Sequence, residues 1–207
     1  MSSTTRSAAK RGGFSLIEVA VFVVVLGVGF AGMLVLYNRL TSASVDPMVR
    51  KQALAIAVSL LEEIELRGFT YCDPDDANVY TATSAVVGAG GCNATVEGIG
   101  PEGETRLGAT RFDNVSDYHD FKMGSGQTDP DIRTLDNSTI PALSTYSLEV
   151  AVAVIAQDEL PGFKTAPGAG ESPVADALRI TVTARHPGTG VTVSLQGYRT
   201  RYAPNSP

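Results

Sequence analysis

The sequence predicts an α+β fold in which a long N-terminal helix packs on an antiparallel β-sheet. An apolar segment near the N-terminus is followed, after a short polar stretch, by residues with helical spacing. In the last third of the chain, apolar and polar residues alternate as they do in strands with one buried face. We therefore expect one helix with a transmembrane half and an amphipathic half, and the sheet covers the amphipathic half.

The transmembrane half is expected over residues 14–40. From Val19 to Tyr37 the only ionisable group is the tyrosine hydroxyl. As a helix this run is roughly 28 Å long, which is about the thickness of a hydrocarbon core. Residues 1–13 contain basic side chains and no acidic one, although the whole chain has a formal charge of −6. This asymmetry favours a cytoplasmic N-terminus and a C-terminal body outside the cytoplasm, residues 41–207.

The amphipathic half is expected to begin at Pro47, with Asp46 as its cap, and to end before Gly68. Apolar residues recur there at intervals of three and four: Val49, Ala53, Ile56, Ala57, Leu60, Leu61 and Ile64. The opposite face carries Arg50, Lys51, Gln52, Ser59, Glu62, Glu63 and Arg67. We expect a single helix over residues 14–67, with a kink or break near Pro47.

Three strands are expected in the C-terminal third, over residues 146–154, 178–185 and 191–196. Pro187 to Gly190 supplies a tight turn, which makes a hairpin of residues 178–199. Residues 161–173, rich in proline and glycine, are expected to form a surface loop. Residues 69–144 have weak periodicity and are expected to be loops with short strands at most.

Composition argues against catalysis and against binding to nucleic acid. The negative net charge disfavours contact with phosphate backbones. Two His and two Cys make a His/Cys metal cluster almost impossible, and no nucleophile motif accompanies His119. The run from Gly27 to Gly32 fits a dinucleotide-binding pattern, but it lies inside the apolar helix instead of at a strand-to-helix turn. We expect no catalytic residue, no metal, no cofactor and no nucleic-acid partner.

Cys72 and Cys92 are the only cysteines and stand 20 positions apart. In an exported domain they are expected to pair, and a loop of this size gains roughly 3 kcal/mol from closure. Two unpaired buried thiols are the alternative.

Two acidic segments are expected to face water. In the first, Asp73, Asp75 and Asp76 lack the spacing of a calcium loop, so a solvated acidic turn is favoured over a metal site. In the second, residues 111–121, aromatic side chains are expected to anchor a loop while its aspartates are solvated.

The N-terminus has three interpretations. A cleaved secretory signal needs a shorter apolar region, and a plain signal anchor explains the length and the basic flank. Neither explains why Gly13 stands directly before the apolar helix or why a carboxylate is placed at Glu18. A carboxylate is costly as it approaches the membrane interior, which indicates a specific role, although a glutamate that reaches back to water is the simpler alternative.

The segment Gly13-Phe14-Ser15-Leu16-Ile17-Glu18 resembles the class III signal of type IV prepilins. That signal has a basic leader ending in glycine, an aromatic first mature residue and glutamate as the fifth. The resemblance implies that prepilin peptidase cuts between Gly13 and Phe14 and methylates the new amino terminus. It also implies that Glu18 pairs with the Phe14 amine of a neighbouring subunit during filament assembly, and that the fold is pilin-like.

Two further segments resemble prepilin-like minor pilins of the mannose-sensitive haemagglutinin (MSHA) pilus group: residues 52–64 and the sequence beginning Arg111-Phe112-Asp113. The resemblance implies a minor pilin involved in pilus assembly or adhesion. Its partners would be prepilin peptidase, the inner membrane before assembly, and other pilins through the N-terminal helix. The alternatives are a pseudopilin of a type II secretion or DNA-uptake system, and a membrane-anchored periplasmic binding module that never polymerises.

Overall fold

The computed structural model of the protein describes residues 13, 15–155, 159 and 177–201, and for residues 39–46 it describes the backbone only. The chain divides into two compact units, residues 1–45 and 46–207. The expected loop over residues 161–173 lies outside the described residues, as does Phe14.

Helix α1 runs from Leu16 to Glu65 and contains Pro47. A kink or a break was expected near this proline; the helix continues through it, so there is no break. Proline removes one backbone donor and crowds the preceding turn, which lowers helix stability without by itself forcing the chain to leave the helix. The amphipathic stripe has its expected role, because Val49, Ala53, Ala57, Leu60 and Ile64 are buried.

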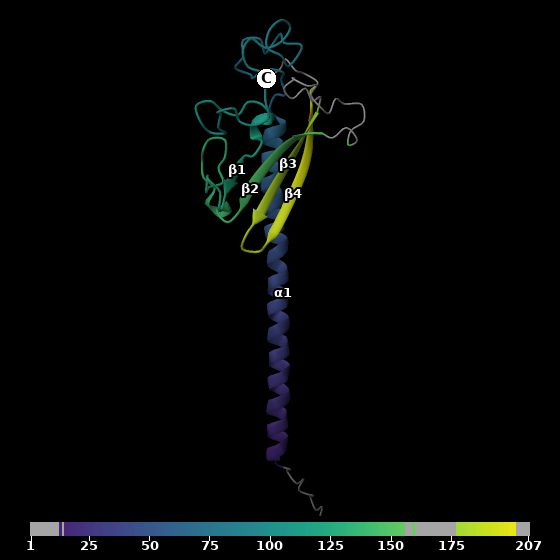
Figure 1. Ribbon diagram of the computed structural model, residues 1–207. Coiled ribbons are helices and arrows are strands. Elements are labelled where there is room, and N and C mark those ends of the chain that lie inside the picture. The colour runs from purple at the N-terminus through teal and green to yellow at the C-terminus, as the bar shows by residue number, and fades with distance from the viewer. Residues whose placement is uncertain (1–12, 14, 156–158, 160–176, 202–207) are drawn as a thin grey trace, which may run out of the picture. The chain divides into compact units, whose positions relative to one another are not determined.

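The sheet is antiparallel and contains strands β1 (Lys122–Gly124), β2 (Ser147–Val154), β3 (Ala177–His186) and β4 (Val191–Thr200), in the order β1-β2-β3-β4. Figure 1 shows these strands side by side along the C-terminal part of α1. The three strands expected from alternation are present, and β3 and β4 form the expected hairpin, with Val182 opposite Leu195. Strand β1 falls within the expectation of short strands at most over residues 69–144, but its position was not predicted, because three residues are too few to show a period.

One hydrophobic core joins α1 to the sheet. It contains the buried stripe of α1 together with alternate residues of the strands, among them Leu148, Val150, Val152, Ile180 and Val182. Aromatic side chains from the following loops complete it: Phe112, Tyr118 and Tyr146 are all nearly fully buried. The α+β architecture predicted from the sequence is therefore confirmed.

The long region between α1 and β2 is mainly loops and turns, as expected, with short 3₁₀ helices η1 (Ser116–Tyr118) and η2 (Pro141–Leu143). A second, smaller core lies in this region and consists of Cys72, Val79, Ala82 and Cys92. The Gly68–Asn114 bridge connects the end of α1 to the segment that carries η1. The loops are thus packed units tied to the helix and the sheet.

Candidate functional site in the N-terminal segment and the connecting loops

The segment expected to be processed lies at the beginning of α1. Gly13 is exposed, and a Cβ placed on it would meet nothing within 4 Å. The Ser15 carbonyl accepts hydrogen bonds from the Glu18 and Val19 amides and so opens the helix. Glu18 stands in the first turn of α1, where a carboxylate interacts favourably with the helix dipole. The Gly13–Phe14 bond therefore precedes the helix, and Glu18 lies within it.

Helix α1 begins with a stretch that could cross a membrane by length and composition. Residues Leu16–Asn38 have a mean hydropathy of 2.8, and none of the most apolar window is buried. Large apolar side chains such as Phe22, Phe30 and Leu34 are each more than 60% exposed. A Cβ on Gly27, Gly29 or Gly32 would meet nothing within 4 Å, so the dinucleotide-binding pattern lies in open helix surface. This apolar surface needs lipid or protein to cover it.

Cys72 and Cys92 form a disulfide, with their Cα atoms 5.4 Å apart, so the alternative of two unpaired thiols is wrong. The bridge lies in the smaller core and is itself fully buried. It closes a loop that packs few apolar side chains, so the covalent link supplies stability that this loop does not obtain from burial.

Asp76 was expected to be solvated, and this expectation is wrong. Its side chain is 7% exposed, and its two oxygens accept hydrogen bonds from the amides of Asn78, Asn93, Ala94 and Thr95. Burial alone would raise the pKa of Asp76, but these donors stabilise the charged form more and hold the pKa well below its ordinary value. Asp76 therefore organises the disulfide loop from within.

The aspartates of residues 111–121 were also expected to face water, and this is wrong for Asp117. Its side chain is 3% exposed, and its Oδ2 accepts hydrogen bonds from the Asp113 amide at 3.0 Å and the Asn114 amide at 2.7 Å. Asp113 is half-buried and Asp120 is exposed. The expected aromatic anchor is present, because the rings of Phe112, Tyr118 and Phe121 pack edge to face.

Glu97 joins Asp117 in the interior, and Ser116 Oγ donates a hydrogen bond to Glu97 Oε1 at 2.6 Å. Burial and the Asp117 carboxylate raise the pKa of Glu97 to about 9, and burial raises the pKa of Asp117. Burial and nearby carboxylates raise the pKa of Glu104 to about 7 and that of Asp113 to about 6. The loops therefore gather carboxyl groups that ionise at unusually high pH.

Two triads of carboxylates lie close together: Asp73, Asp75 and Glu104, and Glu104, Asp113 and Asp117, each with oxygens within 4.8 Å of one another. Clustered acids are common in proteins that bind no ion, and we assign none of these residues as a metal ligand. The expectations that the protein has no metal, cofactor or enzymatic activity stay predictions.

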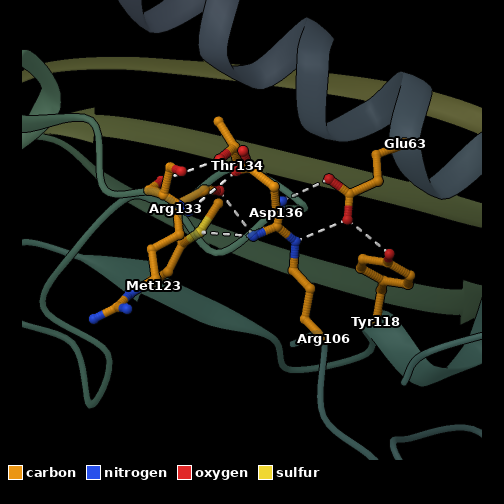
Figure 2. Close-up of polar contacts among 8 residues, drawn as sticks. Glu63, Arg106, Tyr118, Met123, Arg133, Thr134 and Asp136 are labelled. Atoms are coloured by element: carbon orange, nitrogen blue, oxygen red, sulfur yellow. Dashed lines mark hydrogen bonds and ion pairs between the residues drawn. The ribbon is translucent and has the colours of Figure 1, made fainter. Parts of the chain in front are cut away.

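A buried ion pair connects α1 to the loops. Arg106 Nε and Nη2 donate to the two oxygens of Glu63 at 2.8 and 2.7 Å, and the Tyr118 hydroxyl donates to Glu63 Oε1 at 2.8 Å. Figure 2 shows Arg106 and Tyr118 both directed at Glu63 on the helix. Arg106 Nη1 donates to the Arg133 carbonyl at 2.9 Å. Glu63 had been placed on the exposed face of the helix; its side chain is only 10% exposed.

Beside this ion pair lies a groove of about 600 Å³ between α1 and the loop that precedes β2. Ile56, Leu60, Met123, Ile132 and Leu143 supply much of its apolar lining. Its volume lies in the range of small-molecule sites.

The two histidines contact residues of the sheet and its turns. His119 Nδ1 accepts a hydrogen bond from the Val152 amide at 3.2 Å, which attaches the loop after η1 to β2. His186 contacts the Tyr146 ring and accepts from the Thr189 amide in the β3–β4 turn. Both histidines therefore contact neighbouring structural elements.

Sequence reasoning missed Glu63, Arg106, Glu97 and Asp117 as interacting residues. The position of Glu63 gave a signal, because it adjoins Ile64 and stands three residues after Leu60, at the border of the buried stripe. The others gave none, since they belong to separate loops whose approach depends on the folded core.

No protein-family model matches the chain, and neither a curated protein nor a solved structure matches it at a significant level. Inference about function therefore depends on the chain's own motifs and geometry.

Proposed function

We propose that this protein is a minor pilin of a type IV pilus similar to those of the MSHA group. Prepilin peptidase removes residues 1–13 and methylates Phe14. Before assembly, the subunit is anchored in the inner membrane with its C-terminal unit in the periplasm. It then enters the pilus, where it acts in assembly or adhesion. The segment from Gly13 to Glu18 is the observation that carries this proposal.

The geometry supports this role in two ways. The scissile bond lies before the first turn of α1, and Gly13 presents no side chain to crowd it. The apolar surface that follows is wholly exposed over its most apolar window, as a helix that packs among other helices requires. In the filament, the Glu18 carboxylate pairs with the Phe14 amine of a neighbour and sets the axial register.

Mass spectrometry of the protein extracted from host membranes tests the processing step. We expect a chain that begins at methylated Phe14. The Gly13→Val variant should retain its leader, because a branched side chain crowds the bond that is cut. If the wild-type leader is intact, the signal-anchor interpretation replaces ours.

Purified pili test the role of Glu18. Glu18→Ala should be processed normally but absent from filaments, because the apolar bundle then lacks the partner of the amine. Glu149→Ala, which removes a half-buried carboxylate of β2, is the matched control and should enter filaments as the wild type does. Incorporation of Glu18→Ala at the wild-type level would refute the register role.

The alternatives give different outcomes. A pseudopilin of a secretion or DNA-uptake system would be processed in the same way, and an adjacent operon for that machine would identify it. A binding module that never polymerises is favoured only by the apolar groove beside Arg106. Such a module would be absent from filaments whether or not Glu18 is replaced.

A further inference from the structure

Strand β4 forms one edge of the sheet. It pairs with β3 on one side, and among the described residues no strand pairs with its other side. Figure 1 shows it as the outermost arrow of the sheet. In an antiparallel strand, alternate residues direct their amide and carbonyl groups away from the neighbouring strand. About half of the backbone groups of β4 therefore point outward, where only another strand satisfies them as a row.

The sequence of β4 does not block this edge. Proteins commonly block an open edge with lysine, proline, a bulge or a very short strand. Residues 191–198 contain no charged residue and no proline. The strand has ten residues, and its pairing with β3 is continuous from Val191 to Thr200, so no bulge interrupts it. An edge this long and regular is suited to pairing with another chain.

The hydrophobic core is incompletely covered at the same edge. Val193 and Leu195 of β4 pack against the core but are only partly buried. Their partners across the strand pair, Ala184 and Val182 of β3, are fully buried. The sheet therefore ends before its apolar face is fully covered.

Helix α1 continues this uncovered surface. Leu54, Val58 and Leu61 recur at intervals of four and three, so they lie on one side of the helix. That side faces β4, because a Cβ placed on Gly197 would lie 3.0 Å from Leu61 Cδ1. Leu54 and Val58 are 42% and 37% exposed. The apolar residues of α1 and β4 at this edge together form what we call the edge surface: Leu54, Val58, Leu61, Val193 and Leu195.

We propose that β4 accepts an additional strand from a partner protein, namely an extended segment with apolar residues at alternate positions. The backbone of this segment pairs with the outward groups of β4. Its apolar side chains lie on the same side of the sheet as Val193 and Leu195 and cover Leu54 and Val58. In this mode of recognition the main-chain hydrogen bonds supply affinity, and the alternate side chains supply specificity. The inference goes beyond the proposed function, because the edge surface includes no residue of the processed segment.

The direction of β4 argues against a second copy of β4 as the added strand. The beginning of β4 pairs with His186, whose ring contacts that of Tyr146, and the Tyr146 hydroxyl donates to Gln52. Near the end of β4, Arg199 donates to the Arg67 carbonyl. Strand β4 thus runs in the same direction as α1, and two antiparallel β4 strands would set their helices in opposite directions. Copies anchored in one membrane by the apolar part of α1 instead run in one direction.

Hydrogen exchange on the full chain in detergent micelles tests the proposal with a synthetic peptide. The probe is a peptide of about ten residues in which valine and threonine alternate, with a glutamate at each end for solubility. At about ten times its dissociation constant, the outward amides of β4 should exchange about tenfold more slowly. The inward amides, which already pair with β3, should change little. The same peptide with a central proline cannot continue the ladder and should leave all of these rates unchanged.

Two variants of α1 locate the binding surface. Val58→Glu places a charge on the edge surface and should weaken peptide binding about tenfold or more, because the bound peptide would bury that charge. Ala55→Glu is the matched control, since Ala55 is also exposed but lines the groove beside Arg106. This variant should bind the peptide as the wild type does. Thermal unfolding of both variants checks that each is folded.

Several results would contradict the proposal. Outward amides of β4 that are already protected without peptide would show that the edge is occupied. Protection that rises with protein concentration alone would identify a second copy as the added strand. If the peptide slows exchange only beside Arg106, or binds Val58→Glu and Ala55→Glu equally well, the edge surface is not its binding site.

Discussion

Glu63 accepts hydrogen bonds from both Arg106 and Tyr118, and this small group attaches α1 to the loops that follow it. The charges are nearly buried, with side-chain exposures of 5% for Arg106 and 10% for Glu63. Removing a charged group from water is costly, and two-pronged contact with a partner offsets that cost. Removing one partner should therefore lower the stability of the protein more than the intact pair raises it, because the other charge is left buried and unpaired.

Replacing Arg106 with Met should lower the free energy of unfolding by about 3 kcal/mol, because Glu63 is then a buried charge without its cation. Urea unfolding of the full chain in micelles, followed by tyrosine fluorescence, measures this change. The double variant Glu63→Leu/Arg106→Met should lose much less than the sum of the single changes.

The half-exposed pair Lys122–Glu149, whose charged atoms are 3.1 Å apart, supplies the control. Lys122→Met should change stability by less than about 1 kcal/mol, since solvent already screens that pair. If Arg106→Met lowers the free energy of unfolding by no more than Lys122→Met does, burial does not make the loss of Arg106 costly.

Single residues also show where sequence reasoning reaches its limit. The pairing of Cys72 with Cys92 was expected, because these are the only cysteines in the chain. The burial of Asp76 and Asp117 was not, since aspartate in a polar stretch is normally solvated. Each is held by backbone amides that only the folded loops bring together.

At the scale of elements, periodicity made strands and helix predictable wherever one face is buried. The alternation over residues 178–185 appears as β3, whose Ile180 and Val182 enter the core. Periodicity does not predict strand β1, because the strand is short. The turn after it fixes its position. Gly124 ends β1 with a φ of +95°, and its amide donates to the Asp129 carbonyl at 2.7 Å.

Gly124→Ala should therefore destabilise the C-terminal unit more than an ordinary glycine substitution does. An alanine with left-handed φ costs about 1–2 kcal/mol, and at this position its Cβ would also lie 2.2 Å from the Tyr146 carbonyl oxygen. Gly126→Ala is the control, because Gly126 has a φ of +77° but nothing within 4 Å of an added Cβ. Thermal unfolding of both variants should show the larger decrease in melting temperature for Gly124→Ala. Equal decreases would mean that β1 shifts to accommodate the added Cβ without loss of stability.

At the scale of the whole molecule, the two units obtain their stability from different surroundings. Among the residues described in the first unit, none is buried, and the apolar side chains of its helix depend on a lipid or protein environment. Among the described residues of the second unit, the members of both hydrophobic cores lie within residues 49–195. In the sequence, the two parts of the helix differ in the same way, as an unbroken apolar run and an amphipathic stripe.

The second unit should consequently fold without the first. We expect residues 46–207 to be soluble without detergent and to unfold cooperatively, with a midpoint in urea close to that of the C-terminal unit in the full chain. The reason is that, in the part of the chain that the structure describes, every residue of the main core follows residue 46, including the stripe of α1. A fragment that begins after residue 67 is the control, and it should fail to fold, because it lacks Val49, Ala53, Ala57, Leu60 and Ile64. Aggregation of the longer fragment would show that the second unit does not fold without the first. Cooperative folding of the shorter fragment would show that the core does not require the amphipathic half of α1.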